Sequence, residues 1–157
     1  MEKKKVSIVF FSGDLDKALA GMVIATGAAA MGMETKLFFT FWGLNVIKKK
    51  KSMGKNIIQK MLNMMNYGGA DRIKLSKFNF GGAGTELIKQ MMKKERIPSL
   101  PELIKVAHEF GAKFYACDTT IALMGLSKDD FIDEVEDIAD VTGYLQDASE
   151  SDITLFI

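Results

Sequence analysis

The thiol of Cys117 is the side chain in this sequence with the clearest potential for covalent chemistry. Cys117 is the only cysteine among 157 residues and stands in the stretch F-Y-A-C-D-T-T-I-A-L-M-G-L at 114–126. The thiolate is the nucleophilic form of cysteine, and a helix starting near Thr119 would favour it. The negative charge of the neighbouring Asp118 disfavours it. The residues alone leave two interpretations open, a reactive thiol or a small buried hydrophobe.

Other motifs that could carry chemistry are weaker. His108 is the only histidine, and a Cys–His pair or a Ser–His–Asp triad would require it to meet residues distant in the chain. Gly81–Thr85 precedes a predicted helix and can cradle an anion, but it matches neither a P-loop nor a dinucleotide-binding motif, which favours a flexible loop. The acidic run at 129–140 lacks the pattern of a calcium loop. We therefore expect no metal and no cofactor.

Composition indicates one globular domain spanning 1–157. Hydrophobic residues make up 48% of the chain, with only 2 prolines and a net charge of +1. A single cysteine excludes an internal disulfide and is typical of a reducing compartment, so we expect a cytoplasmic protein. No stretch approaches the roughly 20 apolar residues of a transmembrane helix, so we expect no integral membrane segment.

Charge is distributed unevenly along the chain. Residues 45–77 contain nine Lys or Arg and one acid, whereas residues 128–152 contain ten acids and one base. Such asymmetry marks either a partner surface or two solvated faces. The run Lys48–Lys51 could attract phosphate, an acidic protein or a membrane surface, or simply be solvated. No nucleic-acid motif accompanies it, so we expect no nucleic-acid partner.

The elements that must position Cys117 alternate between strands and helices. Apolar, β-rich runs predict strands at Val6–Phe11, Glu34–Thr40, Lys113–Cys117 and Ile153–Ile157. Val135–Ala139 has a poor strand pattern and is assigned as a strand because the alternation of elements needs one there. Helical patterns lie between them, and residues 45–96 form a less regular helical insertion. This alternation predicts an α/β fold, a three-layer sandwich with a mostly parallel five-stranded sheet.

In such a sheet, ligands bind beyond the carboxyl ends of the strands. Three turns leave the predicted strands at this edge, at residues 12–14, 40–43 and 117–120, and Cys117 ends the third strand. The thiol is therefore expected at the mouth of a pocket. The candidate pocket residues are Ser12, Gly13, Asp14, Thr40, Phe41, Trp42, Asp118, Thr119, Thr120 and Met124.

Four segments together resemble the DsrE/DsrF-like sulfur-carrier family, in its long "peroxiredoxin-like" branch often found beside TusA-like sulfurtransferases. These segments are V-S-I-V-F-F-S-G-D-L-D-K-A at 6–18, L-F-F-T-F-W-G-L at 37–44, A-C with M-G at 116–117 and 124–125, and Y-L-Q-D-A with D-I-T-L-F-I within 144–157. The similarity covers nearly the whole chain. Relatives tend to have Gln-Met-Ser-like residues after the cysteine, where this chain has Asp118, Thr119 and Thr120.

The resemblance implies a three-layer α/β fold and assembly into oligomers, here a homo-oligomer. It also implies that Cys117 holds sulfur as a persulfide or thiosulfonate, received from a donor and passed to an acceptor thiol. Our hypothesis is an intracellular sulfur carrier with sulfurtransferase-like chemistry and a TusA-like partner. The alternative is a non-catalytic scaffold of the same fold that binds a small anion or nucleotide.

Overall fold

A parallel five-stranded sheet forms the centre of the protein. The structure, a computed structural model, describes residues 3–49, 54–66 and 68–157. In this part of the chain the sheet has the order β4-β3-β2-β1-β5, and every neighbouring pair is parallel. The strands are β1 (Lys5–Phe10), β2 (Glu34–Phe39), β3 (Lys113–Cys117), β4 (Val135–Ala139) and β5 (Ile153–Phe156). The predicted α/β class and its five strands are confirmed.

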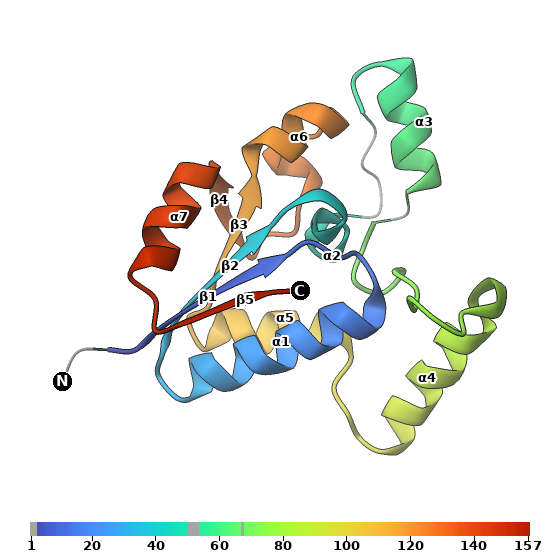
Figure 1. The fold of residues 1–157 in the computed structure, drawn as a ribbon. Helices are drawn as coiled ribbons and strands as arrows, with labels where there is room; N and C mark the ends of the chain where they lie inside the picture. Colours follow the sequence, from blue (N-terminus) through green and yellow to red (C-terminus); the bar gives the residue numbers. More distant parts are fainter. Residues whose placement is uncertain (1–2, 50–53, 67) are drawn as a thin grey trace.

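One face of the sheet carries the main core. Helices α1 (Leu15–Ala30) and α5 (Leu100–Glu109) cover it side by side (Figure 1). α1 is rich in alanine and glycine, which lets it approach the strands closely. A Cβ at Gly21 would clash with the ring of Phe10, so glycine is needed at this contact. The rings of Phe10 and Phe39 stack beneath these helices at 4.7 Å, and both are fully buried.

The opposite face of the sheet has a thinner cover. Helix α7 (Val141–Ser149) lies on this side (Figure 1) and buries none of its residues completely. Its Tyr144 stacks on Phe38 at 5.1 Å. Phe38, Val9 and Cys117 form a small buried cluster separate from the main core. Helix α6 (Asp118–Met124) follows β3 directly.

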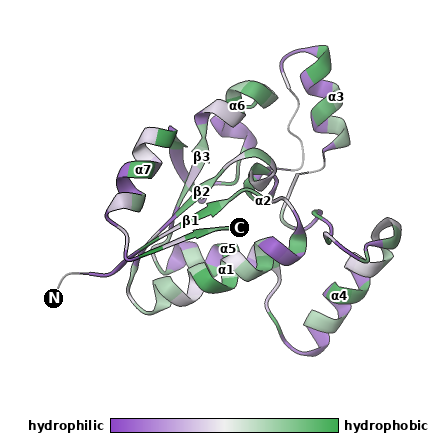
Figure 2. Cartoon of the chain, viewed as in Figure 1, coloured by the Kyte–Doolittle hydropathy of each residue, from purple (hydrophilic) through white to green (hydrophobic). Residues whose placement is uncertain are grey.

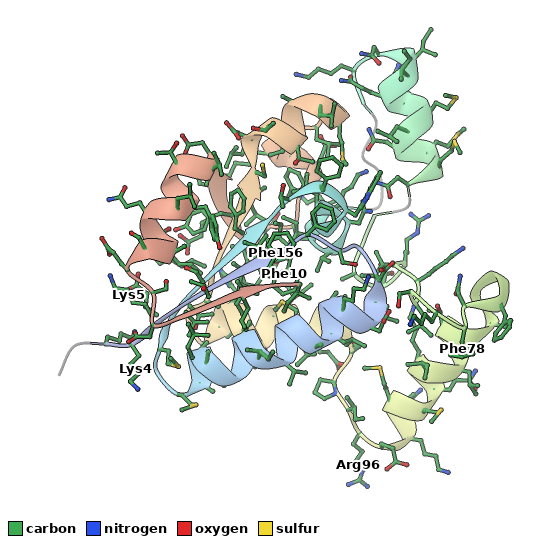
Figure 3. The ribbon with its side chains drawn as sticks, viewed as in Figure 1. Lys4, Lys5, Phe10, Phe78, Arg96 and Phe156 are labelled. Atoms are coloured by element: carbon green, nitrogen blue, oxygen red, sulfur yellow. The ribbon has the colours of Figure 1, made fainter. Side chains whose placement is uncertain are left out.

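The predicted helical insertion leaves the carboxyl end of β2. It contains α2 (Leu44–Ile47), α3 (Ile57–Met65) and α4 (Ala83–Lys94), and α3 and α4 lie beyond the carboxyl ends of the strands (Figure 1). Phe78 and Arg96, at the two ends of the α4 segment, point away from the sheet (Figure 3). None of the helices in the described ranges has the length and apolar character needed to span a bilayer.

Candidate functional site

The three predicted turns lie together at the carboxyl edge of the sheet. Phe10 pairs with Phe39, and Phe39 pairs with Ala116, so β1, β2 and β3 end at the same level. The first two turns are in backbone contact. A Cβ at Gly13 would clash with the Trp42 carbonyl, and a Cβ at Gly43 would clash with the Phe10 carbonyl. Glycine at both positions therefore allows the turns to meet.

Thr120 joins the second turn to the third. Its Oγ1 accepts a hydrogen bond from the Phe41 backbone N–H at 3.1 Å and shares another with Thr40 Oγ1 at 3.1 Å. The Thr120 side chain is buried. Phe41 has a φ of 50°, which is rare for an aromatic residue. The Thr120 hydroxyl thus holds a strained backbone at the edge of the site.

Cys117 lies where the sequence predicts it, at the end of β3 and immediately before α6, where it is the N-cap residue. It is only 7% exposed and packs with Val9 and Phe38 on the α7 side of the sheet. Ala139 of β4 lies beside it in register. The thiol therefore combines a position at the carboxyl edge of the sheet with an apolar environment that limits access.

The residues that follow Cys117 are bonded to one another. The Asp118 carboxylate accepts hydrogen bonds from the backbone N–H and, at 3.0 Å, from the hydroxyl of Thr119. Both residues are exposed. The carboxylate is thus occupied within the first turn of α6.

The turn after β1, at residues 12–14, borders a cavity that is separate from the surroundings of Cys117. Ser12 Oγ donates to the Asp14 carboxylate at 2.9 Å, and Asp14 pairs with Lys17 at 2.8 Å. A cavity of about 510 Å³ opens beside them, and Cys117 does not line it. Its wall is formed by Ser12, Gly13, Asp14, Trp42, Asn45, Met65, Asn66, Arg72, Ile73, Lys74 and Leu75.

Two further candidates lie away from the thiol. Met124 is buried in the main core, and its carbonyl accepts from the Asn63 amide at 3.0 Å. His108, at the end of α5, makes an edge contact with the ring of Phe114 at 6.1 Å. Phe114 is near the start of β3, whereas Cys117 ends that strand. The Cys–His pair that the sequence left open therefore gains no support.

A row of aromatic rings borders the same edge and extends beyond the predicted residues. Phe11 lies 5.7 Å from Phe156 and 5.7 Å from Phe41, and Phe41 lies 5.8 Å from Trp42. All four rings are exposed to solvent. The signal in the sequence is Phe11 directly after β1, Phe41 and Trp42 separated from the end of β2 by one residue, and Phe156 in β5, which pairs with β1.

Two curated proteins match the chain along its full length. The first, "Uncharacterized protein YrkE" of Bacillus subtilis, is 44% identical over 99% of this chain and 98% of its own. The second, "Sulfur carrier protein DsrE2" of Allochromatium vinosum, is 35% identical over 100% of both chains. A distant sulfur carrier is therefore among the relatives of this protein.

Solved structures show the same fold at low sequence identity. MTH1491 from Methanobacterium thermoautotrophicum, described as of unknown function, superposes with a TM-score of 0.53 at 13% identity. The ychN protein from E. coli superposes with a TM-score of 0.56 at 11% identity. Each comparison covers 98% of this chain and 99% of the other. The profile of the DsrE/DsrF/DrsH-like family matches residues 2–156, so the resemblance seen in the sequence is confirmed, and the chain belongs to this family.

Proposed function

We propose that this protein carries sulfane sulfur on Cys117 and passes it to an acceptor protein. The main support is the position of the only cysteine at the carboxyl end of a central parallel strand. This is where α/β proteins place reacting groups. The full-length similarity to a sulfur carrier supports the same chemistry.

The carrier cycle consists of two thiol exchanges. In the first, the Cys117 thiolate attacks the outer sulfur of a donor persulfide, forms a new S–S bond and releases the donor thiolate. In the second, an acceptor thiolate attacks the outer sulfur of the Cys117 persulfide, takes it and regenerates the Cys117 thiolate. With thiosulfate as donor, the leaving group is sulfite. Neither exchange requires a separate oxidant or reductant.

The surroundings of Cys117 favour transfer between proteins. The thiol is mostly buried, so loading requires the edge of the sheet to open or a partner to approach closely. The exposed rings of Phe11, Phe41 and Trp42 offer an apolar contact surface at the same edge of the sheet. We therefore propose a TusA-like donor or acceptor, a cytoplasmic location and assembly into a homo-oligomer.

Mass spectrometry of the intact protein tests the proposal. After incubation with thiosulfate or polysulfide, we expect Cys117 to gain the mass of one sulfur atom, and dithiothreitol to remove it. The matched control is Cys117→Ser, which should gain nothing. An Asp118→Asn variant should load faster with anionic thiosulfate, because it removes a neighbouring negative charge. If wild-type Cys117 stays unmodified after incubation with every donor, the proposal is wrong.

The scaffold alternative also has an observation in its favour. The hydroxyls of Ser12, Thr119 and Thr120 are already hydrogen-bonded within the protein, and Cys117 is shielded. Rates of thiol alkylation separate the two functions. Carrier chemistry predicts labelling of the folded protein, whereas a scaffold predicts labelling only after unfolding.

A further inference from the structure

Helix α3 attaches to the body of the protein through polar groups. Asn63 is buried; its Oδ1 accepts from Lys48 Nζ at 2.7 Å, and its Nδ2 donates to the Met124 carbonyl at 3.0 Å. Gln59 Nε2 donates to the Leu123 carbonyl at 3.3 Å. These contacts fix α3 on the end of α6 with its polar side inward.

The apolar side of α3 consequently faces solvent. Its five exposed large apolar residues are 54% to 85% exposed: Ile57, Ile58, Met61, Met64 and Met65. Figure 2 shows hydrophobic residues along this outlying helix. Amphipathic helices normally bury such a side, and exposed apolar patches usually mark interaction sites. The orientation of α3 therefore indicates a docking surface.

Lysines border this surface. Lys55 precedes α3 and Lys60 lies within it; both are exposed, and no acid of the described residues forms an ion pair with either. Lys49, by contrast, pairs with Asp133 at 3.2 Å. We call the five apolar residues with Lys55 and Lys60 the basic face. A partner surface complementary to the basic face would be apolar with an acidic border.

The chain itself carries such a surface at the junction of β4 and α7. Val141 and Leu145, one helical turn apart, are 57% and 58% exposed, and Ile138 precedes them. Exposed carboxylates accompany them; Asp137 pairs with Lys128 at 3.5 Å, whereas Glu136 and Asp140 form no ion pair with any described residue. We call this the acidic face; its residues are Glu136, Asp137, Ile138, Asp140, Val141 and Leu145.

We propose that the basic face of one copy of this chain docks on the acidic face of a second copy. Within one chain the two faces cannot meet, because α3 and α7 lie on opposite sides of α6 (Figure 1). Each copy offers one face of each kind, so the contact is heterologous and copies add head to tail, closing into a ring where the rotation between copies allows it.

The composition of α3 favours a protein over a membrane as the occupant. Helices that lie in the membrane interface typically insert Trp, Phe or Leu, whereas the exposed apolar side chains of α3 are Ile and Met. Methionine suits contacts with protein surfaces. A second copy is preferred over a foreign protein because every copy supplies the complementary face. The proposal does not depend on sulfur chemistry at Cys117.

Two matched double variants test the contact. Ile58→Gln with Met65→Gln disrupts the apolar part of the basic face, and Val141→Gln with Leu145→Gln disrupts the apolar part of the acidic face. All four side chains are exposed, so both variants should keep the wild-type circular dichroism spectrum. In sedimentation velocity we expect the wild type to associate and each variant alone to sediment as a smaller species. An equimolar mixture should form a one-to-one complex, because each partner retains one intact face.

The equimolar mixture of the two double variants is the critical measurement. A mixture that stays unassociated, or a variant that keeps the wild-type size, overturns the proposal. So does a wild type that stays monomeric yet binds anionic vesicles through Ile58 and Met65, which would assign α3 to a membrane. Added salt should weaken the association, since charges border both faces. Cys117→Ser should assemble as the wild type does, which separates this test from that of sulfur loading.

Discussion

At the scale of single residues, Thr120 has the greatest structural influence on the site. Its hydroxyl satisfies the backbone N–H of Phe41, which sits in a strained conformation. The same hydroxyl contacts Thr40, so one buried side chain couples the end of β2 to the turn after Cys117. Loss of this group leaves a polar backbone group without its partner.

Thr120→Val keeps the shape and removes the hydroxyl. We expect the free energy of unfolding to fall by about 1–3 kcal/mol, the usual cost of an unsatisfied buried group, and Cys117 to load sulfur more slowly. Urea denaturation and intact-mass time courses measure the two effects. Thr120→Ser should restore both, and Thr119→Val, at an exposed neighbour, should change stability little. Equal losses in the Thr119 and Thr120 variants would contradict this role.

The positions of these residues could be predicted from the sequence, but their bonds could not. Parallel strands bring their carboxyl ends to one edge, so apolar runs ending in Ser12, Thr40 and Cys117 are enough to predict a shared edge. The acceptor to which a hydroxyl donates its hydrogen bond depends on the exact geometry of the turn, to within about an ångström. Ser12 bonds to Asp14 two residues away, and the exposure of Cys117 depends on how closely Phe38 and Val9 surround it.

At the scale of elements, α3 shows what the spacing of apolar residues in a sequence cannot predict. The spacing of Ile57, Ile58, Met61, Leu62, Met64 and Met65 predicts a helix, and the helix is present. Of these residues, Leu62 packs against the main core and the other five are exposed. Periodicity shows that two sides differ but not which side is buried. Here Asn63 is buried because it pairs with Lys48. Lys48 belongs to a run interpreted as a solvated or partner-binding feature, but its side chain is buried; Lys50 and Lys51 lie outside the described residues.

Asn63→Ala should loosen α3 in a pH-dependent way. Burial lowers the pKa of Lys48 below its ordinary value of 10.5, although Asp130 acts in the opposite direction. A lowered pKa means that the fold disfavours the charged amine, so stability rises as the pH climbs through the folded pKa towards 10.5. We expect Asn63→Ala to cost about 2–3 kcal/mol near neutrality, and less in alkali where Lys48 is neutral.

Hydrogen exchange of residues 54–66, followed from neutral to alkaline pH, measures this local stability. Asn66→Ala is the matched control, because the partner of the Asn66 side chain among the described residues is the neutral amide of Asn45, at 2.7 and 3.2 Å. Its cost should not depend on pH in this range. A pH-independent defect in Asn63→Ala would contradict the assigned role of Lys48.

At the scale of the whole molecule, the two faces of the sheet differ in how well they are covered. Phe39 points to the main core under α1 and α5, whereas its neighbour Phe38 points to the small cluster under α7. Strand alternation predicts that these neighbours lie on opposite faces. The unequal cover could not be predicted, because it depends on how closely each helix settles on the strands.

The same change, Phe to Ala, at the neighbouring positions Phe39 and Phe38 compares the two faces of the sheet. We expect Phe39→Ala to cost about 3–5 kcal/mol, as for a ring removed from a closed core. Phe38→Ala should cost clearly less, since its cluster is small and α7, which covers it through Tyr144, buries none of its own residues completely. Urea denaturation of both variants checks this difference. Equal costs would show that α7 covers its face as firmly as α1 and α5 cover theirs.

The pairing of β5 with β1 has a consequence for the synthesis of the chain. β1 is synthesised before β5, yet β5, at residues 153–156, is its neighbour on one side. The Phe11 and Ser12 backbone N–H groups likewise donate to the Ile157 carbonyl. At 5–20 residues per second, that side of β1 waits roughly 7–30 seconds for its partner. During this interval a ribosome-bound chain presents an open strand edge beside an unfinished site, and an open edge of this kind is prone to pair with another chain.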